Sequence, residues 1–381
     1  TLSINSPLSL LNGSLMTHEV SHAGAVYGLD VYISGTLTVD NTSAIDVSGN
    51  GYLGANVGDN LASNTGRTQD NTTSGGSSDT AGGSHGGVGG EPSRSVSATY
   101  GDMTEPSLPG AGGGALGDLD TGGNGGGTIR IQVTGALSYA GTIAADGQPG
   151  AGMAGGGAGG SIWLEAPDCS GTGQISANGG SGGAGGAPTG GGGGGRVALD
   201  APNATITGTI TAAGGTGGNS GPAGQDGTVY YPYGITWSGL GDEVLWSDTA
   251  NWNPPVQPNA WNSVFLTLEE GIQAALDIDA QVAGLQIGGD TGTQTLTISQ
   301  SSLTLGGNGD VGENGVLIVD GGTIDGVGVI ANDGAITLRD NTAIELVADN
   351  RGSISVSSGA VAHLNGGLTT GDQSSLVIAG G

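Results

Sequence analysis

The stretch Thr128-Ile-Arg-Ile-Gln-Val133 recurs twice in altered form, as Ser161-Ile-Trp-Leu-Glu-Ala166 and Arg196-Val-Ala-Leu-Asp-Ala201. A shorter version, Thr228-Val-Tyr-Tyr231, follows. In these stretches apolar residues fall at every second position, and a period of two is typical of a β-strand buried on one face. The leading apolar residues are spaced by 33, 35 and 32 positions, namely Ile129, Ile162, Val197 and Val229. The chain therefore contains an internal repeat.

A second short stretch follows each of the first three at a nearly constant distance. It reads Thr142-Ile-Ala-Ala-Asp146, Gln174-Ile-Ser-Ala-Asn178 and Thr209-Ile-Thr-Ala-Ala213, and the earlier Ala44-Ile-Asp-Val-Ser48 resembles it. The isoleucines of the three later copies are spaced by 32 and 35 positions. Because two separate stretches keep step, we interpret the repeat as strand, short link, strand and glycine-rich return segment.

The C-terminal part repeats at a shorter interval. Gly315-Val-Leu-Ile-Val319, Gly334-Ala-Ile-Thr-Leu338 and Gly352-Ser-Ile-Ser-Val356 are spaced by 19 and 18 positions. Short strands at this interval predict one coil of a β-solenoid per repeat, with strands stacked about 4.8 Å apart in parallel sheets. We therefore expect an all-β fold, an elongated parallel β-helix (β-solenoid) with glycine-rich extended returns.

Glycine supplies 85 of the 381 residues, and much of it falls in the runs 147–160, 179–195 and 214–227. One interpretation of such runs is a set of flexible linkers. However, each run joins strands that must stack in register, so its ends are held at constant spacing. Our hypothesis is that the runs are ordered, extended or polyproline-II-like, and packed on one another through their glycine faces. The less regular segment near 62–127 is expected to be a surface excursion.

These patterns divide the chain into three regions. We expect a glycine-rich β-solenoid over 1–236, a Trp-rich junction over 237–270, and a regular β-solenoid of 18–20-residue coils over 271–381. The junction holds four of the five tryptophans, Trp237, Trp246, Trp252 and Trp261. Buried aromatic rings of this size can close the interior of a solenoid, and exposed ones can bind sugar. We favour closure of the interior.

The charge of the chain limits its partners. The chain has six arginines, no lysine and 34 acidic residues, which gives a net charge of −28. Nucleic acid and anionic membrane surfaces are therefore not expected partners. No run of 18 apolar residues predicts a membrane span. Without lysine the chain cannot form Lys–Asn isopeptide bonds, and the single Cys169 excludes an intramolecular disulfide.

One motif suggests metal chemistry. His18-Glu19-Val20-Ser21-His22 matches the H-E-x-x-H pattern, in which two histidines on one helical face bind zinc and the glutamate acts as general base. The flanking stretches read as strands, and in a strand His18 and His22 would lie about 13 Å apart. A zinc peptidase is thus a remote alternative, and no enzymatic activity is expected.

Calcium is a second candidate ion. Asp310 with Glu313, and the pair Asp277 and Asp279, offer the oxygen ligands that Ca²⁺ prefers. The turn that contains Asp310 only partly matches the calcium-binding nonapeptide, because its acid lies one position early. The alternative is that these acids are simply solvated at turns.

Several stretches also resemble known surface proteins. Ser34-Gly-Thr-Leu-Thr-Val-Asp40, Gly83-Ser-His-Gly-Gly-Val-Gly-Gly90 and Gly159-Gly-Ser-Ile-Trp-Leu164 resemble a glycine-rich β-helical module of very large secreted bacterial surface proteins. Trp246-Ser-Asp-Thr-Ala-Asn-Trp252 resembles the Trp-x-x-x-x-x-Trp opening of adhesin and autotransporter-passenger repeats. The resemblance implies a right-handed parallel β-helix, export to the cell surface of a bacterium, and an adhesive or structural role without catalytic residues.

We therefore expect a structural extracellular protein, the subunit of a non-covalent filament or surface fibre assembled head-to-tail. Its partner is a second copy, joined by strand addition through Leu2 and Ile4 at one end and Leu376 and Ile378 at the other. The alternative is an adhesin stalk or a glycan-binding module of a larger secreted protein. For glycan binding the candidate aromatic residues are Trp163, Tyr230, Tyr231 and Tyr233.

Overall fold

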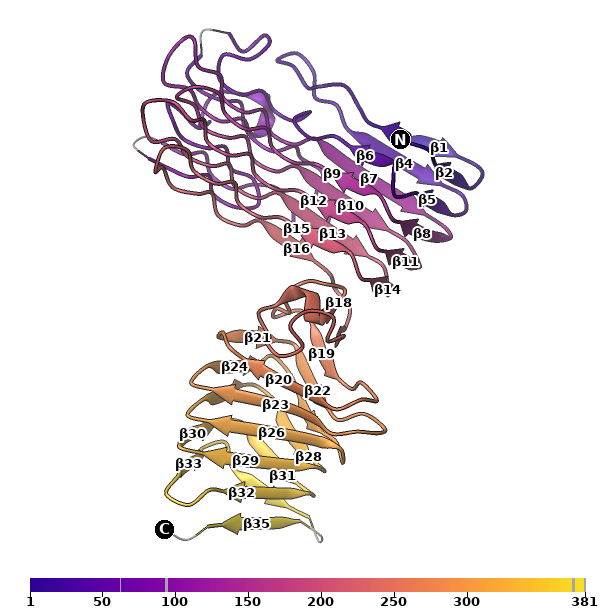
Figure 1. Cartoon of the computed structure of the whole chain (residues 1–381), viewed down its shortest axis with the longest axis vertical. Coiled ribbons are helices and arrows are strands. Elements are labelled where there is room, and N and C mark those ends of the chain that lie inside the picture. Colours follow the sequence, from indigo (N-terminus) through magenta and orange to yellow (C-terminus); the bar gives the residue numbers. More distant parts are fainter. Residues whose placement is uncertain (62, 93–94, 372–373, 380–381) are drawn as a thin grey trace. The chain divides into compact units, whose positions relative to one another are not determined.

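The computed structural model describes residues 1–61, 63–92, 95–371 and 374–379. Over these residues the chain is nearly all β, with two 3₁₀ turns, η1 (Gln69–Asn71) and η2 (Thr249–Asn251), and no α-helix. The chain divides into two compact units, Thr1–Tyr231 and Pro232–Gly381 (Figure 1). The Trp-rich junction expected between two segments therefore belongs to the second unit.

The first unit contains three sheets whose strands all run parallel. In spatial order the first sheet holds β1 (Leu2–Ile4), β4 (Leu29–Ile33), β7 (Thr128–Val133), β10 (Ser161–Glu165), β13 (Arg196–Asp200) and β16 (Thr228–Tyr230). The second holds β2 (Leu8–Leu10), β5 (Leu37–Val39), β8 (Ala136–Tyr139), β11 (Asp168–Gly171) and β14 (Asn203–Ile206). The third holds β3 (Leu15–Met16), β6 (Ala44–Asp46), β9 (Thr142–Ala144), β12 (Gln174–Ser176) and β15 (Thr209–Thr211).

The chain visits the three sheets in turn and then returns to the first, an arrangement consistent with a β-solenoid. We call one such passage a coil. The register confirms the repeat read from the sequence, because Ile162 is the partner of both Ile129 and Val197, and Val197 is the partner of Val229. These side chains point inward, and Ile129, Ile162 and Val197 are at most 1% exposed. Because side chains alternate with period two, each coil contributes apolar residues to rows that stack in a common core.

Each coil has three strands where the sequence predicted two. The strands that were missed are those of the second sheet, such as β8, β11 and β14. They are four residues long, and Asp168-Cys-Ser-Gly171 offers only one clearly apolar residue, Cys169. Cys169 is 1% exposed, and its inward position is visible only once the neighbouring strands are aligned.

The return segments of the first unit are ordered, and they form a hydrogen-bonded layer on one side of the strands (Figure 1). The run 190–195 shows the pattern. Its successive N–H groups donate in rotation to three neighbouring segments, 80–83, 222–225 and 177–180, at 2.7–3.0 Å. Its carbonyl groups accept from other segments, among them 156–159 and 87–90. A direction that repeats every third residue is that of a polyproline-II helix, which has three residues per turn.

Glycine is required in this layer because the backbones touch. A Cβ atom built on any glycine of 190–195 would lie 1.9–2.2 Å from a carbonyl oxygen of a neighbouring segment. No side chain fits at that distance, whereas the bare backbones can pair fully. The hypothesis that the returns are ordered and packed through their glycine faces is therefore confirmed.

The segment near 62–127 differs from our expectation of a surface excursion. Parts of it lie inside the glycine-rich layer, where Ala81, His85 and Ala111 are completely buried. Gly83 donates to Gly156, and Gly113 donates to Gly123, so the segment contributes additional lines of the same layer. The low apolar content that suggested exposure is instead what close backbone packing demands.

The second unit also contains three sheets. In spatial order the first holds β18 (Trp252–Asn253), β17 (Ile235–Trp237), β19 (Ser263–Leu266), β22 (Gly284–Ile287), β25 (Gly309–Val311), β28 (Val329–Asn332), β31 (Val347–Asn350) and β34 (Leu368–Thr370). The second holds β20 (Ile272–Leu276), β23 (Gln294–Ser299), β26 (Gly315–Asp320), β29 (Ala335–Arg339), β32 (Ser353–Val356) and β35 (Ser375–Ile378). The third holds β21 (Ala280–Val282), β24 (Ser302–Leu305), β27 (Thr323–Gly326), β30 (Asn341–Ile344) and β33 (Val361–Leu364).

The coils of the second unit have no long returns. Leu317 pairs with Ile336 and Ile336 with Ile354, which confirms the spacing of 19 and 18 read from the sequence. Other coils are longer, since Ile272 pairs with Gln294, 22 positions on. The interior also contains a polar ladder, in which the buried Asn332 donates to the Oδ1 atom of the buried Asn350 at 2.6 Å.

The tryptophans close one end of this second unit. Trp237, Trp246 and Trp252 are at most 1% exposed. The Trp252 ring packs edge-on against the other two, with centroids 4.8 Å and 4.7 Å apart, and β18 runs antiparallel to β17 at the end of its sheet. This cluster fills the interior, as expected, whereas Trp261 is 52% exposed.

Candidate functional site

The first coil of the chain ends in three unpaired strand edges. Among the described residues β1 pairs only with β4, β2 only with β5, and β3 only with β6, so each strand has one free edge. Leu2 stands in the row of the buried Val31, and Ile4 in the row of the buried Ile33. Leu2 is 57% exposed, and no described residue continues its row on that side.

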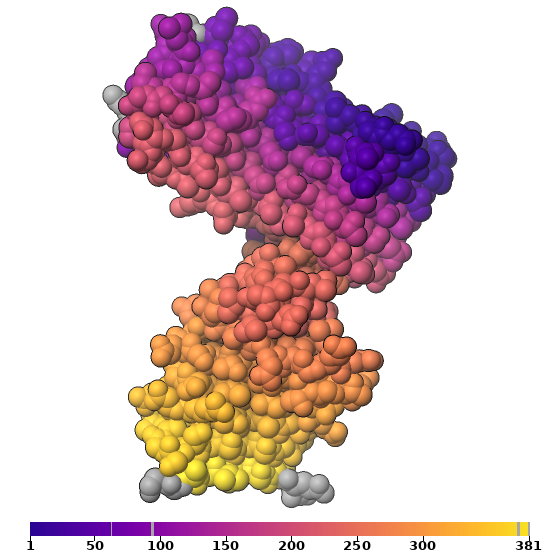
Figure 2. Space-filling model, in the orientation of Figure 1, coloured from indigo at the N-terminus to yellow at the C-terminus, as the bar shows by residue number. Residues whose placement is uncertain are grey.

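The last coil of the second unit has the same property. Within the described part of the chain, β33, β34 and β35 each pair with one strand only. Leu376 and Ile378 continue the rows of Ile354 and Val356, and Ile378 is 69% exposed. Figure 2 shows this coil, in yellow, at the surface of the second unit. The four predicted assembly residues thus lie on free edge strands.

The two sets of edges have matching polarity. A free first edge and a free last edge, both in parallel ladders, can continue each other's order without reversing any strand. Free N–H and C=O groups together with an exposed apolar row are the features that favour strand addition. By contrast, the Trp cluster leaves no comparable apolar row at the start of the second unit.

The H-E-x-x-H motif does not form a helix. Residues 17–21 are irregular, and His22 begins a tight turn that closes on Ala25. The Nε2 atom of His18 faces the backbone N–H of Thr128 at 3.4 Å, and burial lowers the pKa of this imidazole. Glu19 is exposed. The structure therefore does not place His18, Glu19 and His22 on one helical face.

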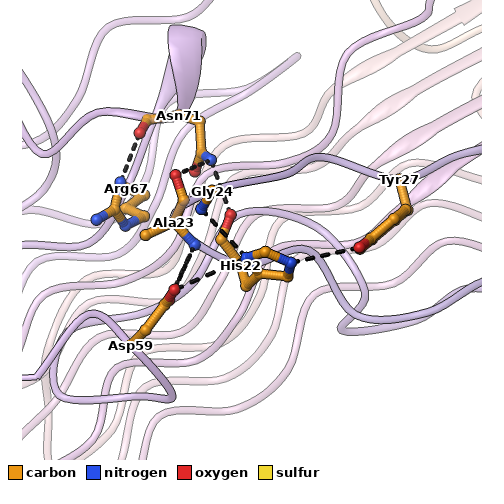
Figure 3. A network of polar contacts seen from close by, with 7 residues as sticks. All are labelled: His22, Ala23, Gly24, Tyr27, Asp59, Arg67 and Asn71. Atoms are coloured by element: carbon orange, nitrogen blue, oxygen red, sulfur yellow. Dashed lines mark hydrogen bonds and ion pairs between the residues drawn. The ribbon is translucent and has the colours of Figure 1, made fainter.

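His22 instead belongs to a polar network among three loops (Figure 3). Its Nε2 atom lies 3.3 Å from the Tyr27 hydroxyl, and its Nδ1 atom accepts from the N–H of Gly24. The Asp59 carboxylate accepts from the N–H of Ala23, and Asn71 donates to the carbonyls of His22 and Ala23. These bonds fasten the loop of His22 to the loops around 59 and 71.

The four candidate calcium ligands differ in their surroundings. Asp277 accepts from the N–H and hydroxyl of Ser247, and Asp279 accepts from the N–H of Ser302. Asp310 lies exposed in β25, and Glu313 lies exposed in the following turn. Among the described residues no three His, Cys, Asp or Glu side chains gather closely enough to hold a metal ion.

The candidate aromatic residues divide between the two units. Trp163 and Tyr230 lie on the outer face of the first sheet, where the Arg130 guanidinium stacks 4.3 Å from the centre of the Trp163 ring. Tyr231 is 4% exposed, and Tyr233 belongs to the second unit. One outward tryptophan and one outward tyrosine therefore share a face.

A buried polar cluster escaped the sequence reading. His85 is completely buried, and its Nδ1–H donates to the carbonyl of Gly159 at 2.9 Å. Its Nε2 atom has no partner, and Arg196 donates to the carbonyl of the adjacent Tyr100. Burial first, and then the Arg196 charge, lower the pKa of His85 to about 4. Only the unusual position of a histidine within a glycine run signalled this site.

Comparison of the chain with family models, with curated proteins and with solved structures gave no match. The described residues contain no helix of the length and apolar character that crossing a membrane requires.

Proposed function

We propose that this protein is a structural extracellular protein, the subunit of a non-covalent filament or surface fibre of a bacterium. In this proposal both units are closed, right-handed parallel β-helices, and one copy adds its first coil to the last coil of the next. The observation that carries the proposal is the pair of free, apolar strand edges, with Leu2 exposed at one end and Ile378 at the other.

The geometry of the edges supports an open-ended assembly. The contact joins two different surfaces, and such a heterologous contact generates filaments unless its rotation closes a ring. Three parallel strands on one copy meet three on the next, so their backbone groups pair as they do inside each unit. Because each copy carries a net charge of −28, assembly should strengthen as salt rises.

The test uses one blocked edge in each of two variants. The Ile4 carbonyl accepts from Ser34, so the N–H groups of Leu2 and Ile4 face β4 and that of Ser3 faces the free side. Ser3→Pro therefore removes an N–H from the free edge of β1, and Leu376→Pro removes one from the free edge of β35. We expect the unaltered chain to form filaments in electron micrographs and each variant alone to remain monomeric. A mixture of the two variants should form heterodimers and stop there, since each supplies one intact edge.

The control is Leu119→Pro, at an exposed residue (98%) outside the strand edges. It should leave filaments unchanged. A wild-type chain that stays monomeric in light scattering at high concentration and high salt would contradict the proposal.

The alternative role is an adhesin stalk or glycan-binding module of a larger secreted protein. In that case further coils of one chain, rather than a second copy, would cover the free edges. The outward pair Trp163 and Tyr230 supports a binding role. A monomer that binds surface glycans, with binding lost in Trp163→Ala, would favour this alternative.

A further inference from the structure

A groove lies in the first unit where the second sheet turns into the third. It is shallow and open to solvent, has a volume of about 420 Å³ and crosses three successive coils. Its lining comes from the equivalent turns of those coils and from one earlier loop, and consists of Asn41, Ala140, Gly141, Thr142, Thr172, Gly173, Gln174, Thr207, Gly208 and Thr209. The groove is thus built by the repeat itself. Its last turn joins β14 and β15, the outermost strands of their sheets at the end opposite β2 and β3, so the groove is distant from the assembly edges of β1, β2 and β3.

Stacked glycines form the floor of the groove. A Cβ atom on Gly141 would lie 2.1 Å from the carbonyl oxygen of Ser43. On Gly173 and on Gly208 it would lie 1.9 Å from the carbonyl oxygen of the glycine one coil earlier. Glycine at these turns brings successive coils into backbone contact and leaves the floor without side chains.

Polar side chains form the walls. None of them has a hydrogen-bond partner among the described residues, and they are Asn41, Thr142, Thr172, Gln174, Thr207 and Thr209. The backbone N–H groups of Gln174 and Thr209 are already used, since they donate to Gly141 and Gly173. The groove therefore offers mainly side-chain hydroxyl and amide groups, because the N–H groups of Gln174 and Thr209 are not available to a ligand.

We propose that this groove binds a neutral oligosaccharide lying across the coils. Uncharged hydroxyl and amide groups repeat along it at the strand spacing of about 4.8 Å, so successive sugar hydroxyls can each find a partner. The lining carries no charge, and the net charge of −28 opposes acidic glycans.

The experiment compares two exposed threonines on neighbouring positions of one coil. Thr207→Trp fills the groove, whereas Thr205→Trp places the same side chain on the outer face of β14 outside it. Both variants are first checked for unchanged melting. The probes are neutral gluco-, manno- and galacto-oligosaccharides, with oligogalacturonate as the acidic comparison, and the dissociation constants are measured by calorimetry or by ligand-detected NMR.

We expect at least one neutral oligosaccharide to bind the wild-type chain, with affinity reduced about tenfold or more in Thr207→Trp and unchanged in Thr205→Trp. Absence of binding to every neutral probe, equal binding by both variants, or preference for oligogalacturonate would each overturn the proposal. None of these outcomes depends on filament formation, so this test and the assembly test can fail separately.

Discussion

The two units stack three-stranded coils in parallel sheets but use glycine for different purposes. In the second unit glycines stand singly at turns, as at Gly326 and Gly328, whose φ angles of 122° and 108° disfavour other residues. A neighbouring backbone adds to the requirement there, since a Cβ atom on Gly326 would lie 2.0 Å from the carbonyl oxygen of Leu305. In the first unit no glycine of 190–195 has a positive φ angle. There glycine is needed because a neighbouring backbone occupies the place of its Cβ atom. A glycine-rich segment can therefore be the most closely packed part of a chain.

The largest effect is expected from a methyl group added inside the glycine-rich layer. In Gly192→Ala the Cβ atom would lie 2.0 Å from the carbonyl oxygen of Gly157. Since neither backbone can move without breaking other hydrogen bonds, we expect a loss on the order of 5 kcal/mol in the stability of the first unit. Hydrogen exchange should report lost protection there and unchanged protection in the second unit.

Gly186→Ala is the matched control. Gly186 lies in the same return segment, and no atom lies within 4 Å of its added Cβ atom. It should change stability by less than about 0.5 kcal/mol. Equal effects of the two substitutions would show that the layer is not packed as described.

A corresponding change in the second unit removes part of the Trp cluster. Trp252→Ala deletes a ring that is 1% exposed and in contact with two others. The expected loss is about 3–4 kcal/mol, confined to the second unit. Trp261→Ala, at 52% exposure, should cost little, and both can be compared by denaturant titration followed through tryptophan fluorescence. A loss of protection in the first unit would contradict the independence of the two cores.

Acid should weaken the first unit more than the second, because His85 is buried in the first. The pKa of His85 is held at about 4, below its ordinary value of 6.5, by burial and then by the Arg196 charge. Above pH 6.5 the imidazole is neutral in both states, and the stability is fully present. Between pH 6.5 and 4 only the unfolded chain binds the proton, so stability falls as pH falls, by on the order of 3 kcal/mol.

His85→Gln should flatten most of this dependence in melting experiments, and the lowered pKa of His18 accounts for a remainder of the same sign. His363→Gln, at an exposed position in β33, is the control for replacing a histidine outside the first unit. A wild-type profile that is flat between pH 4 and 6.5 would refute the assignment.

The smallest effect concerns the polar ladder of the second unit. Asn350→Ala removes the acceptor of Asn332 and a donor to the carbonyl of Ser375. We expect a cost of about 1–3 kcal/mol from the unsatisfied groups that remain. Asn365→Ala, whose amide contacts Glu345 at an exposed site, should cost less than about 1 kcal/mol. Chemical denaturation of both variants provides the measurement.

Much of the fold could be predicted because the repeat is carried by apolar residues at fixed spacing. The rows of Ile129 and Ile143 were identified from spacing alone, and the register agrees with them. The second sheet was not predicted because its strands are short and each holds few apolar residues. Their apolar rows are seen only when the strands are aligned, as Cys169 is with Leu137. The candidate edges followed from terminal alternation, but the groove did not, because its threonines are ordinary in sequence and converge only through the turn geometry.

The partnership of Ile45 and Ile143 has a consequence for how such a chain can change in length. These residues are register partners, yet along the sequence they are about three times as far apart as Ile143 and Ile175. The additional chain enters the glycine-rich layer and comes back to the core with the inward rows intact. That layer repeats every three residues, and its segments pair with neighbours in several directions. An inserted glycine-rich segment can therefore add to the layer by the same backbone hydrogen bonds. Sequence growth is thereby directed to one side of the coil, and the strands need not be redesigned to accommodate it.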